Sequence, residues 1–251
     1  MEKISSRKNS LIAHIRKLSS DREYRYLCGE FVCEGQTMLT EALASSAYIT
    51  SVIWSEGSDR EIHGIKNQYC VPEYLYSFLS PSKNSPGPVF TVKIPHAENN
   101  GEITSAIILE NVQDPGNIGT VLRTANAFGI GSVVLTGSCA DIYNIKAVRA
   151  SMGAVFRQRT DTVETGRLKE FIHSNSLKLY AAALSDDSED IRDIDCSNCA
   201  FAVGNEGNGL SVELLRLCEE KVIIPMMPSS ESLNAAVAAS ILIWEIRRKE
   251  L

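Results

Sequence analysis

Long apolar runs are absent from this 251-residue sequence. No stretch approaches the roughly 20 apolar residues that cross a bilayer. The first residues scatter charges where a signal peptide would carry an apolar block. Internal repeats and low-complexity tracts are also missing. These absences argue against membrane and fibrous proteins, and we expect a globular, cytoplasmic protein.

Metal-ligand patterns are equally scarce. The four histidines are scattered, and the seven cysteines form one close pair, Cys196 and Cys199. A tetrahedral zinc site needs a second pair of ligands, and none is visible at a suitable spacing. An odd number of irregularly spaced cysteines is typical of reduced thiols in the cytoplasm. We therefore expect neither a metal site nor disulfides.

The formal net charge of −6 argues against indiscriminate nucleic-acid binding. Its distribution is uneven, because residues 1–25 carry seven basic and three acidic residues, whereas 185–195 is strongly acidic. A basic segment on an acidic protein is typical of an arm that contacts a nucleic-acid backbone. A solvated helix face would have the same composition, so charge alone leaves both interpretations open.

The first 95 residues alternate helical and strand patterns. Polar residues at 96–102, HAENNGE, interrupt this alternation and predict a domain boundary. We expect helices over 4–20, 36–45 and 71–80, and strands over 29–35, 48–56 and 89–92.

After the boundary, apolar runs alternate with helical stripes. SAIILEN at 105–111 is continuously apolar, as in strands buried on both faces. Ile118 to Phe128 form a helical stripe that Gly129 closes. This alternation predicts an α/β protein with a parallel sheet. Further strands are expected at 131–137, 178–184, 199–205 and 221–226, and further helices at 144–154, 164–174, 208–219 and 232–250.

Three loops follow apolar strands, at 110–129, 201–211 and 223–240. In open α/β sheets such loops build the ligand site. The glycines of FAVGNEGNGLS match neither a dinucleotide fingerprint nor a P-loop, which needs a lysine after its last glycine. Glu206 would repel a phosphate but accept hydrogen bonds from a hydroxyl, an amine or an arginine. A tight turn with an exposed glutamate is the alternative.

The other two loops carry further candidates. Asn117 suits the N-cap of a helix that begins at Ile118. Arg123 lies off the apolar stripe, either projecting over the loop or simply solvated. Ser232 and Asn234 open a helix rich in small residues, where a capping role and a ligand contact can coexist.

Together, NVQDPGNIGTVLRTANAFGI, VGNEGNGLS and IPMMPSSESLNAAVAASI resemble the SpoU/TrmH family of the SPOUT superfamily, RNA ribose 2′-O-methyltransferases. IKAVRASMGAVFR at 145–157 is similar to that family as well. KNSLIAHIRKL and REYRYLCGEFVCEGQTMLTEAL resemble its ribosomal-protein-like, RNA substrate-binding domain. The resemblance covers almost the whole chain.

The resemblance implies a C-terminal α/β trefoil-knot methyltransferase domain at 103–251 and a smaller N-terminal α/β RNA substrate-binding domain at 1–98. It further implies that S-adenosyl-L-methionine binds at the GNEGNG turn, with contacts from Gly204, Ile224 and Leu233. Met227 and Pro228 stand where family members commonly have a glycine-containing turn, which bears on the shape of the third loop.

The resemblance makes Arg123 the central catalytic residue, surrounded by Asn117, Glu206, Ser232 and Asn234. Methyl transfer to a ribose hydroxyl is an in-line displacement that depends on positioning. An arginine keeps its proton far above neutral pH, which disfavours its use as a general base. We expect Arg123 to hold the adjacent phosphate and the developing alkoxide, with Glu206 orienting its guanidinium.

For partners, the resemblance implies RNA, with ribosomal RNA favoured over tRNA, and a homodimer formed through residues 103–251. The apolar residues Ile241, Leu242, Trp244 and Ile246 of the last helix suggest the dimer surface. Alternatives are a tRNA 2′-O-methyltransferase, an RNA base methyltransferase, and an inactive RNA-binding protein. The expected RNA-binding residues of the N-terminal domain are Lys8, Arg16, Lys17, Arg22 and Arg25.

Overall fold

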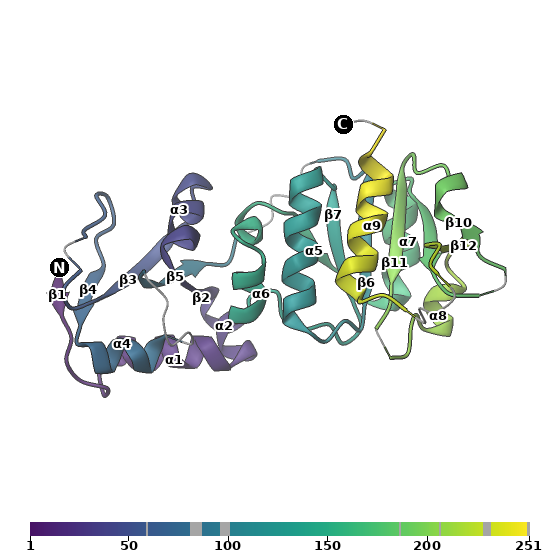
Figure 1. Ribbon diagram of the computed structural model, residues 1–251. Coiled ribbons are helices and arrows are strands. Elements are labelled where there is room, and N and C mark those ends of the chain that lie inside the picture. Colours follow the sequence, from purple (N-terminus) through teal and green to yellow (C-terminus); the bar gives the residue numbers. More distant parts are fainter. Residues whose placement is uncertain are drawn as a thin grey trace. The chain divides into compact units, whose positions relative to one another are not determined.

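The computed structural model describes residues 1–58, 60–80, 87–95, 101–185, 187–205, 207–227 and 232–249. The chain forms two compact units, each with its own sheet (Figure 1). The first unit contains Met1–His96 and Asp141–Phe156, and the second contains Ala97–Ala140 and Arg157–Leu251. Within the described residues, no helix is long and apolar enough to cross a membrane.

The first unit is built on a mixed five-stranded sheet of order β1-β4-β3-β5-β2. Its fourth strand in this order, β5, runs antiparallel to both neighbours, and the other pairs are parallel. The strands are β1 (Glu2–Lys3), β2 (Glu30–Glu34), β3 (Ile49–Ser55), β4 (Gln68–Val71) and β5 (Val89–Lys93).

Helices cover both faces of this sheet (Figure 1). On one face, α1 (Ser10–Ser20) and α4 (Glu73–Leu79) bury an apolar core that includes Ile12, Ile15 and Leu75. Helix α2 (Arg22–Cys28) follows α1, is capped by Asp21, and ends at Gly29 in the left-handed conformation. Helix α3 (Gln36–Ala44) lies across the sheet from α1.

The segment Asp141–Phe156 completes the first unit, although it follows the second unit's first strands in the chain. It contains α6 (Ile145–Ala150) and the 3₁₀ turn η1 (Ala154–Phe156). The Tyr143 ring packs against Phe31 with centroids 4.8 Å apart. The sequence-based division into 1–98 and 103–251 does not foresee this excursion, because it treats each domain as continuous chain.

The second unit has a seven-stranded sheet of order β10-β12-β9-β11-β6-β7-β8, and every pair in it is parallel, as predicted. The central strands β6, β7 and β11 are buried along their whole length, which explains their unbroken apolar runs. The strands are β6 (Ser105–Glu110), β7 (Ser132–Thr136), β8 (Thr160–Thr162), β9 (Lys178–Ala182), β10 (Glu189–Asp190), β11 (Cys199–Val203) and β12 (Glu220–Ile223).

Helices α5 (Pro115–Phe128) and α9 (Ala235–Arg247) pack against each other on this sheet (Figure 1). Leu168 of α7 (Leu168–Ser174) and Leu214 of α8 (Val212–Leu215) join a core with Ala106 and Ile108. The remaining 3₁₀ turns are η2 (Thr165–Arg167) and η3 (Ile191–Asp193). Since all strands are parallel, the loops after β6, β9, β11 and β12 meet at one edge of the sheet.

Candidate functional site

A cavity of about 380 Å³ opens at this carboxyl edge of the parallel sheet. Its walls come from the ends of β9, β11 and β12 and from the start of α9, and most of its lining is apolar. Gly204, Ile224 and Leu233, the three expected cofactor contacts, all line it, and so does Ser232. The volume falls in the range that small-molecule and cofactor sites occupy.

The glycine loop after β11 folds back on itself. The Gly209 N–H donates to the Asn205 carbonyl (2.9 Å), and the Asn205 N–H donates to the Gly209 carbonyl (3.2 Å). A Cβ on Gly204 would lie 2.2 Å from the carbonyl carbon and oxygen of Gly209. Gly209 itself has a φ of +65°. These glycines therefore close the loop, which then presents its backbone to the cavity. Glu206 lies outside the described residues.

Buried polar side chains anchor this loop to the end of β6. Glu110 is buried, and its carboxylate accepts hydrogen bonds from the Ser211 N–H (2.7 Å) and hydroxyl (2.6 Å). The Asn205 amide donates to the Asn111 carbonyl (3.1 Å). The sequence reading did not single out Glu110, Asn111, Asn205 or Ser211. Glu110 could have been found from the sequence, because a carboxylate at the end of a buried strand needs hydrogen-bond donors nearby.

Helix α5 begins earlier than expected. Its N-cap is Asp114, whose side chain accepts from the Gly116 N–H (2.7 Å), and Pro115 takes the first helical position. The prediction that Asn117 caps the helix is therefore wrong, because Asp-Pro is a stronger start signal there. Asn117 lies in the first turn of α5, and its side-chain oxygen accepts a hydrogen bond from Asn234 Nδ2 (3.1 Å).

Helix α9 begins later than expected, at Ala235 instead of Ser232. Asn234 is its N-cap and accepts from the N–H groups of Ala236 (2.9 Å) and Val237 (3.3 Å). One amide side chain thus caps α9 and bridges to α5. The two expected site residues Asn117 and Asn234 are brought into direct contact.

Arg123 is an exposed residue of α5, six positions after Asn117. Six residues correspond to about 9 Å along a helix axis. The structure thus places Arg123 on the helix whose first turn meets Asn234, and places Ser232 on the cavity wall beside Leu233.

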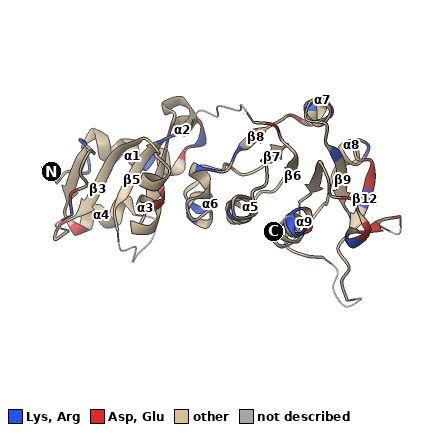
Figure 2. Ribbon diagram, turned by 90° about the horizontal axis from the view of Figure 1, so that it is seen from above, with Lys and Arg blue, Asp and Glu red and all other residues tan. Residues whose placement is uncertain are grey.

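Among the basic residues expected to bind RNA, Lys8, Arg16, Lys17 and Arg22 are exposed, but Arg25 is not. Its side chain is 3% exposed and pairs with Asp141, with Nη2 2.6 Å from Oδ2, while Nη1 donates to the Leu18 carbonyl (2.6 Å). Arg25 is therefore a structural residue of the first unit, and we remove it from the expected RNA surface. Acidic residues of the second unit gather around β12 (Figure 2).

The thiols of Cys196 and Cys199 shift each other's pKa in opposite directions. A hydrogen bond between the two thiols lowers the pKa of Cys196 and, together with burial, raises that of Cys199. All seven cysteines are free. Within the described part of the chain, no three side chains of His, Cys, Asp or Glu cluster as metal ligands would.

The model of the SpoU rRNA Methylase family matches residues 104–244. A 23S rRNA (guanosine(2553)-2′-O)-methyltransferase of Bacillus subtilis is 30% identical over 98% of this chain and 100% of its own.

Two solved structures also match this chain over almost its whole length. The crystal structure of an rRNA methyltransferase from Sinorhizobium meliloti with bound AdoMet is 27% identical, with a TM-score of 0.88 over 100% of this chain and 98% of that one. The SpoU methyltransferase AviRb from Streptomyces viridochromogenes is 26% identical, with a TM-score of 0.84 over 96% and 97% of the two chains.

Proposed function

Because the chain belongs to the SpoU rRNA methylase family and is an S-adenosylmethionine-dependent RNA methyltransferase, we propose that it methylates a ribose 2′-hydroxyl of ribosomal RNA. The observation that carries the proposal is the cavity at the carboxyl edge of the parallel sheet, lined by Gly204, Ile224 and Leu233. Two relatives named above support the RNA target, since one is a 23S rRNA 2′-O-methyltransferase and the other an rRNA methyltransferase with bound AdoMet.

The cavity fits this cofactor chemically. Side chains such as Ala182, Val203 and Leu210 give apolar walls for an adenine ring. The loop at Gly204 and the strand end at Ile224 bring backbone groups to the cavity, which suits hydrogen bonding to adenine and ribose. When bound, S-adenosylmethionine supplies a methyl group on a positively charged sulfur. We assign Gly204, Ile224 and Leu233 to its binding.

The remaining residues would position the RNA hydroxyl and stabilise its charge. We assign Arg123 to the phosphate next to the target ribose and to the oxyanion that develops as the hydroxyl loses its proton. The bonded pair Asn117 and Asn234 would present amide groups to the ribose, and Ser232 would present its hydroxyl from the cavity wall. Glu206 would orient the Arg123 guanidinium. Fixed donors of this kind reduce the reorganisation needed during transfer.

We also place a trefoil knot in the second unit. The start of α9 buries Ala235, Ala236 and Ala239. Such small side chains suit a segment that threads a narrow opening. Knots are rare among protein folds.

We propose that the protein acts in the cytoplasm as a homodimer. An apolar groove on α5 and α9 is lined by Phe128, Val237, Ile241 and Trp244, and the Val237 and Trp244 side chains are 48% and 47% exposed. Leu242 and Ile246, which the sequence suggested for this surface, are buried within the unit.

Light scattering tests the dimer. The protein should run at about twice 27.5 kDa, and Trp244→Glu should convert it to a monomer because a buried unpaired charge is costly. Gln113→Glu, an exposed change outside the groove, is the control. A monomeric wild type would contradict the proposal.

The function is tested by incubating the purified protein with S-adenosylmethionine and unmodified ribosomal RNA or tRNA, and then digesting the product. A 2′-O-methylated nucleoside from ribosomal RNA is expected. A base-methylated nucleoside, or methylation of tRNA alone, would favour the corresponding alternative enzyme. Cofactor binding without transfer to either RNA would indicate an inactive RNA-binding protein.

A further inference from the structure

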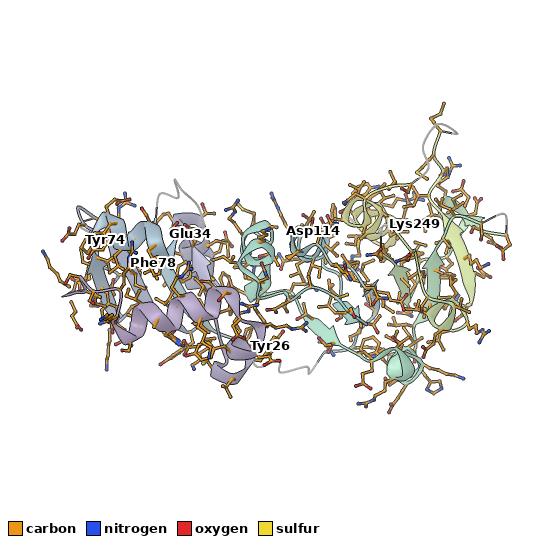
Figure 3. All side chains as sticks on the ribbon, turned by 90° about the horizontal axis from the view of Figure 1, so that it is seen from below. Tyr26, Glu34, Tyr74, Phe78, Asp114 and Lys249 are labelled. Carbon is orange, nitrogen blue, oxygen red and sulfur yellow. The ribbon has the colours of Figure 1, made fainter. Side chains whose placement is uncertain are left out.

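A row of alternating cationic and aromatic side chains crosses helices α4, α1 and α2 of the first unit. Figure 3 shows Tyr74 and Phe78 on α4 and Tyr26 on α2. We refer to the row as the cation–aromatic strip; its members are Arg7, Arg16, Lys17, Arg22, Tyr24, Tyr26, Tyr74 and Phe78.

At one end of the strip, Phe78 contacts two guanidinium groups. The Cζ atoms of Arg7 and Arg16 lie 4.7 and 4.6 Å from its ring centroid. Arg16 Nη1 also donates to the Phe78 carbonyl (3.2 Å), and Arg7 lies 6.0 Å from the Tyr74 centroid. Two cations are thereby fixed beside two rings.

At the other end, Lys17 Nζ lies 4.2 Å from the Tyr24 centroid, and Arg22 Cζ lies 5.8 Å from that of Tyr26. Arg16 and Lys17 are consecutive residues of α1. The α4 half and the α2 half of the strip therefore meet on α1.

Hydrogen bonds hold the tyrosines from their hydroxyl ends. The Tyr24 hydroxyl bonds to His14 Nδ1 (2.9 Å), and His14 Nε2 bonds to Glu30 (3.2 Å). The Tyr26 hydroxyl donates to Asp141 Oδ1 (3.1 Å). The Tyr74 hydroxyl donates to the Ser5 carbonyl. With these hydroxyls engaged, what the strip offers to a ligand is ring surface and positive charge.

A purely structural role does not account for the exposure of the strip. Cation–π pairs at exposed sites contribute only weakly to folding, and the Tyr26 and Tyr74 side chains remain 49% and 53% exposed. Asp21 is engaged in capping α2, and Glu30 pairs with Lys93 outside the strip. The remaining neighbouring acids, Glu23 and Glu73, leave the four cations of the strip in excess. Exposed rings interleaved with cations match unpaired nucleotides, whose base faces stack and whose phosphates need positive charge. A duplex hides its base faces.

We propose that the cation–aromatic strip binds unpaired nucleotides of the RNA substrate, with bases stacking on Tyr26 and Tyr74 and phosphates contacting Lys17 and Arg22. The inference rests on the proposed function for the identity of the ligand. It adds a binding mode, stacking of single-stranded segments, to a region that was expected to bind RNA on the basis of its charge alone.

The test compares binding of a fluorescein-labelled oligouridine with binding of an RNA duplex of equal length. Tyr26→Leu and Tyr74→Leu remove a ring, whereas Tyr26→Phe and Tyr74→Phe remove only the hydroxyl and serve as matched controls. Each leucine variant should bind oligouridine roughly 5- to 150-fold more weakly, the effect of losing one stacked base. The phenylalanine variants should stay within about 2-fold of wild type, because stacking requires the ring face.

Salt dependence separates stacking from charge. Arg22→Gln should lower the slope of log affinity against log salt by roughly one phosphate contact, whereas the leucine variants should leave that slope unchanged. Circular dichroism checks the fold of each variant, and Tyr26→Trp and Tyr74→Trp, which retain a ring, provide a second series expected to bind at least as tightly as wild type.

Two results would overturn the proposal: leucine variants that bind oligouridine as wild type does, or an equal loss for oligouridine and duplex. Failure of the proposed function gives a different result, which is wild-type protein that binds oligouridine but transfers no methyl group to RNA.

Discussion

The two units use different parts of the chain to present their surfaces. In the second unit, apolar side chains and backbone turns at strand ends, such as those at Gly204 and Asn205, make the cavity. The bonded pair Asn117 and Asn234 lies where helices α5 and α9 begin. In the first unit, side chains on helices and on the segments that flank them form the strip and the Arg25–Asp141 ion pair. A backbone-built site requires particular residues at particular spacings, so it leaves a motif in the sequence. In the first unit, Arg16 and Phe78 are 62 positions apart and Arg25 and Asp141 are 116 apart, so no local motif in the sequence identifies these pairs.

The largest effect should come from breaking the buried pair that distinguishes the first unit. Asp141→Asn leaves Arg25 buried without a counter-charge, which costs about 3–5 kcal/mol in the free energy of unfolding. The two tryptophans report each unit separately, since Trp54 lies in the first and Trp244 in the second. Denaturation followed by Trp54 fluorescence in a Trp244→Phe background should show the loss.

The matched control is Asp187→Asn, which breaks the exposed pair with Lys221 in the second unit. Exposed pairs contribute little to stability, so no change is expected. Equal effects of the two substitutions would remove this difference between the units.

Arg123→Ala should reduce methyl transfer by about 10²–10³-fold, the usual loss when a group that stabilises transition-state charge is removed. Because Arg123 is exposed and outside the cavity lining, folding and cofactor affinity should be unchanged by calorimetry. Lysine should not restore the rate, since it lacks the planar fork. Near-normal turnover would show that Arg123 is only a surface charge.

Gly204→Ala tests whether the cavity depends on its backbone turn. The new Cβ would lie 2.2 Å from the backbone of Gly209, so the loop must shift. Overpacking of this kind costs about 1–3 kcal/mol, and we expect roughly 5- to 150-fold weaker S-adenosylmethionine binding by calorimetry.

Gly207→Ala, in the same loop, meets only the Asn205 side-chain oxygen at 3.3 Å and should bind the cofactor within about 3-fold of wild type, a difference below about 1 kcal/mol. Oligouridine binding to the first unit should be unaffected by either change. Normal cofactor affinity in Gly204→Ala would show that the turn can open without affecting the cavity.

The smallest effect should appear at alkaline pH. Burial raises the pKa of Tyr76 to about 12, and burial also raises that of Tyr143, both in the first unit. Tyr180 is the corresponding tyrosine of the second unit, with a pKa raised to about 12. A raised folded-state pKa means that the native state keeps a proton that the unfolded chain releases. The stabilisation is complete below pH 10 and declines from about 10 to 12.

The first unit, with more such groups, should therefore lose more stability between about pH 10 and 12 than the second, as Trp54 and Trp244 fluorescence would report. Tyr143→Phe should reduce the alkaline loss of the first unit. A single transition shared by both tryptophans would contradict the prediction.

In the second unit, the sequence predicted the central strands because their apolar runs are local patterns, but it missed the short strands β8 and β10 and misplaced the N-cap of α5. The apolar runs at β6, β7 and β11 and the terminating Gly129, with a φ of +68°, lie where expected. The α/β class, the family and the cofactor are confirmed by the fold and the comparisons. The residue roles at the site stay predictions.

In the first unit, three predictions failed, each for a different physical reason. Strand β4 was missed because it is only four residues long and begins with the polar Gln68, yet that side chain is buried and bonded to the backbone of Ile62 and Ile65. Helix α2 has no apolar stripe, and only its Asp21 cap and Gly29 stop could have identified it. Arg25 was grouped with RNA-binding residues because its partner Asp141 lies 116 positions away.

That separation also has a consequence during synthesis. At the usual rate of about 5–20 residues per second, Arg25 leaves the ribosome roughly 6–23 s before Asp141 does. Over that interval the nascent chain holds most of the first unit without the segment that neutralises Arg25 and packs on Phe31. The N-terminal residues cannot reach their final packing first, although they are made first. The order of folding along this chain therefore differs from its order of translation.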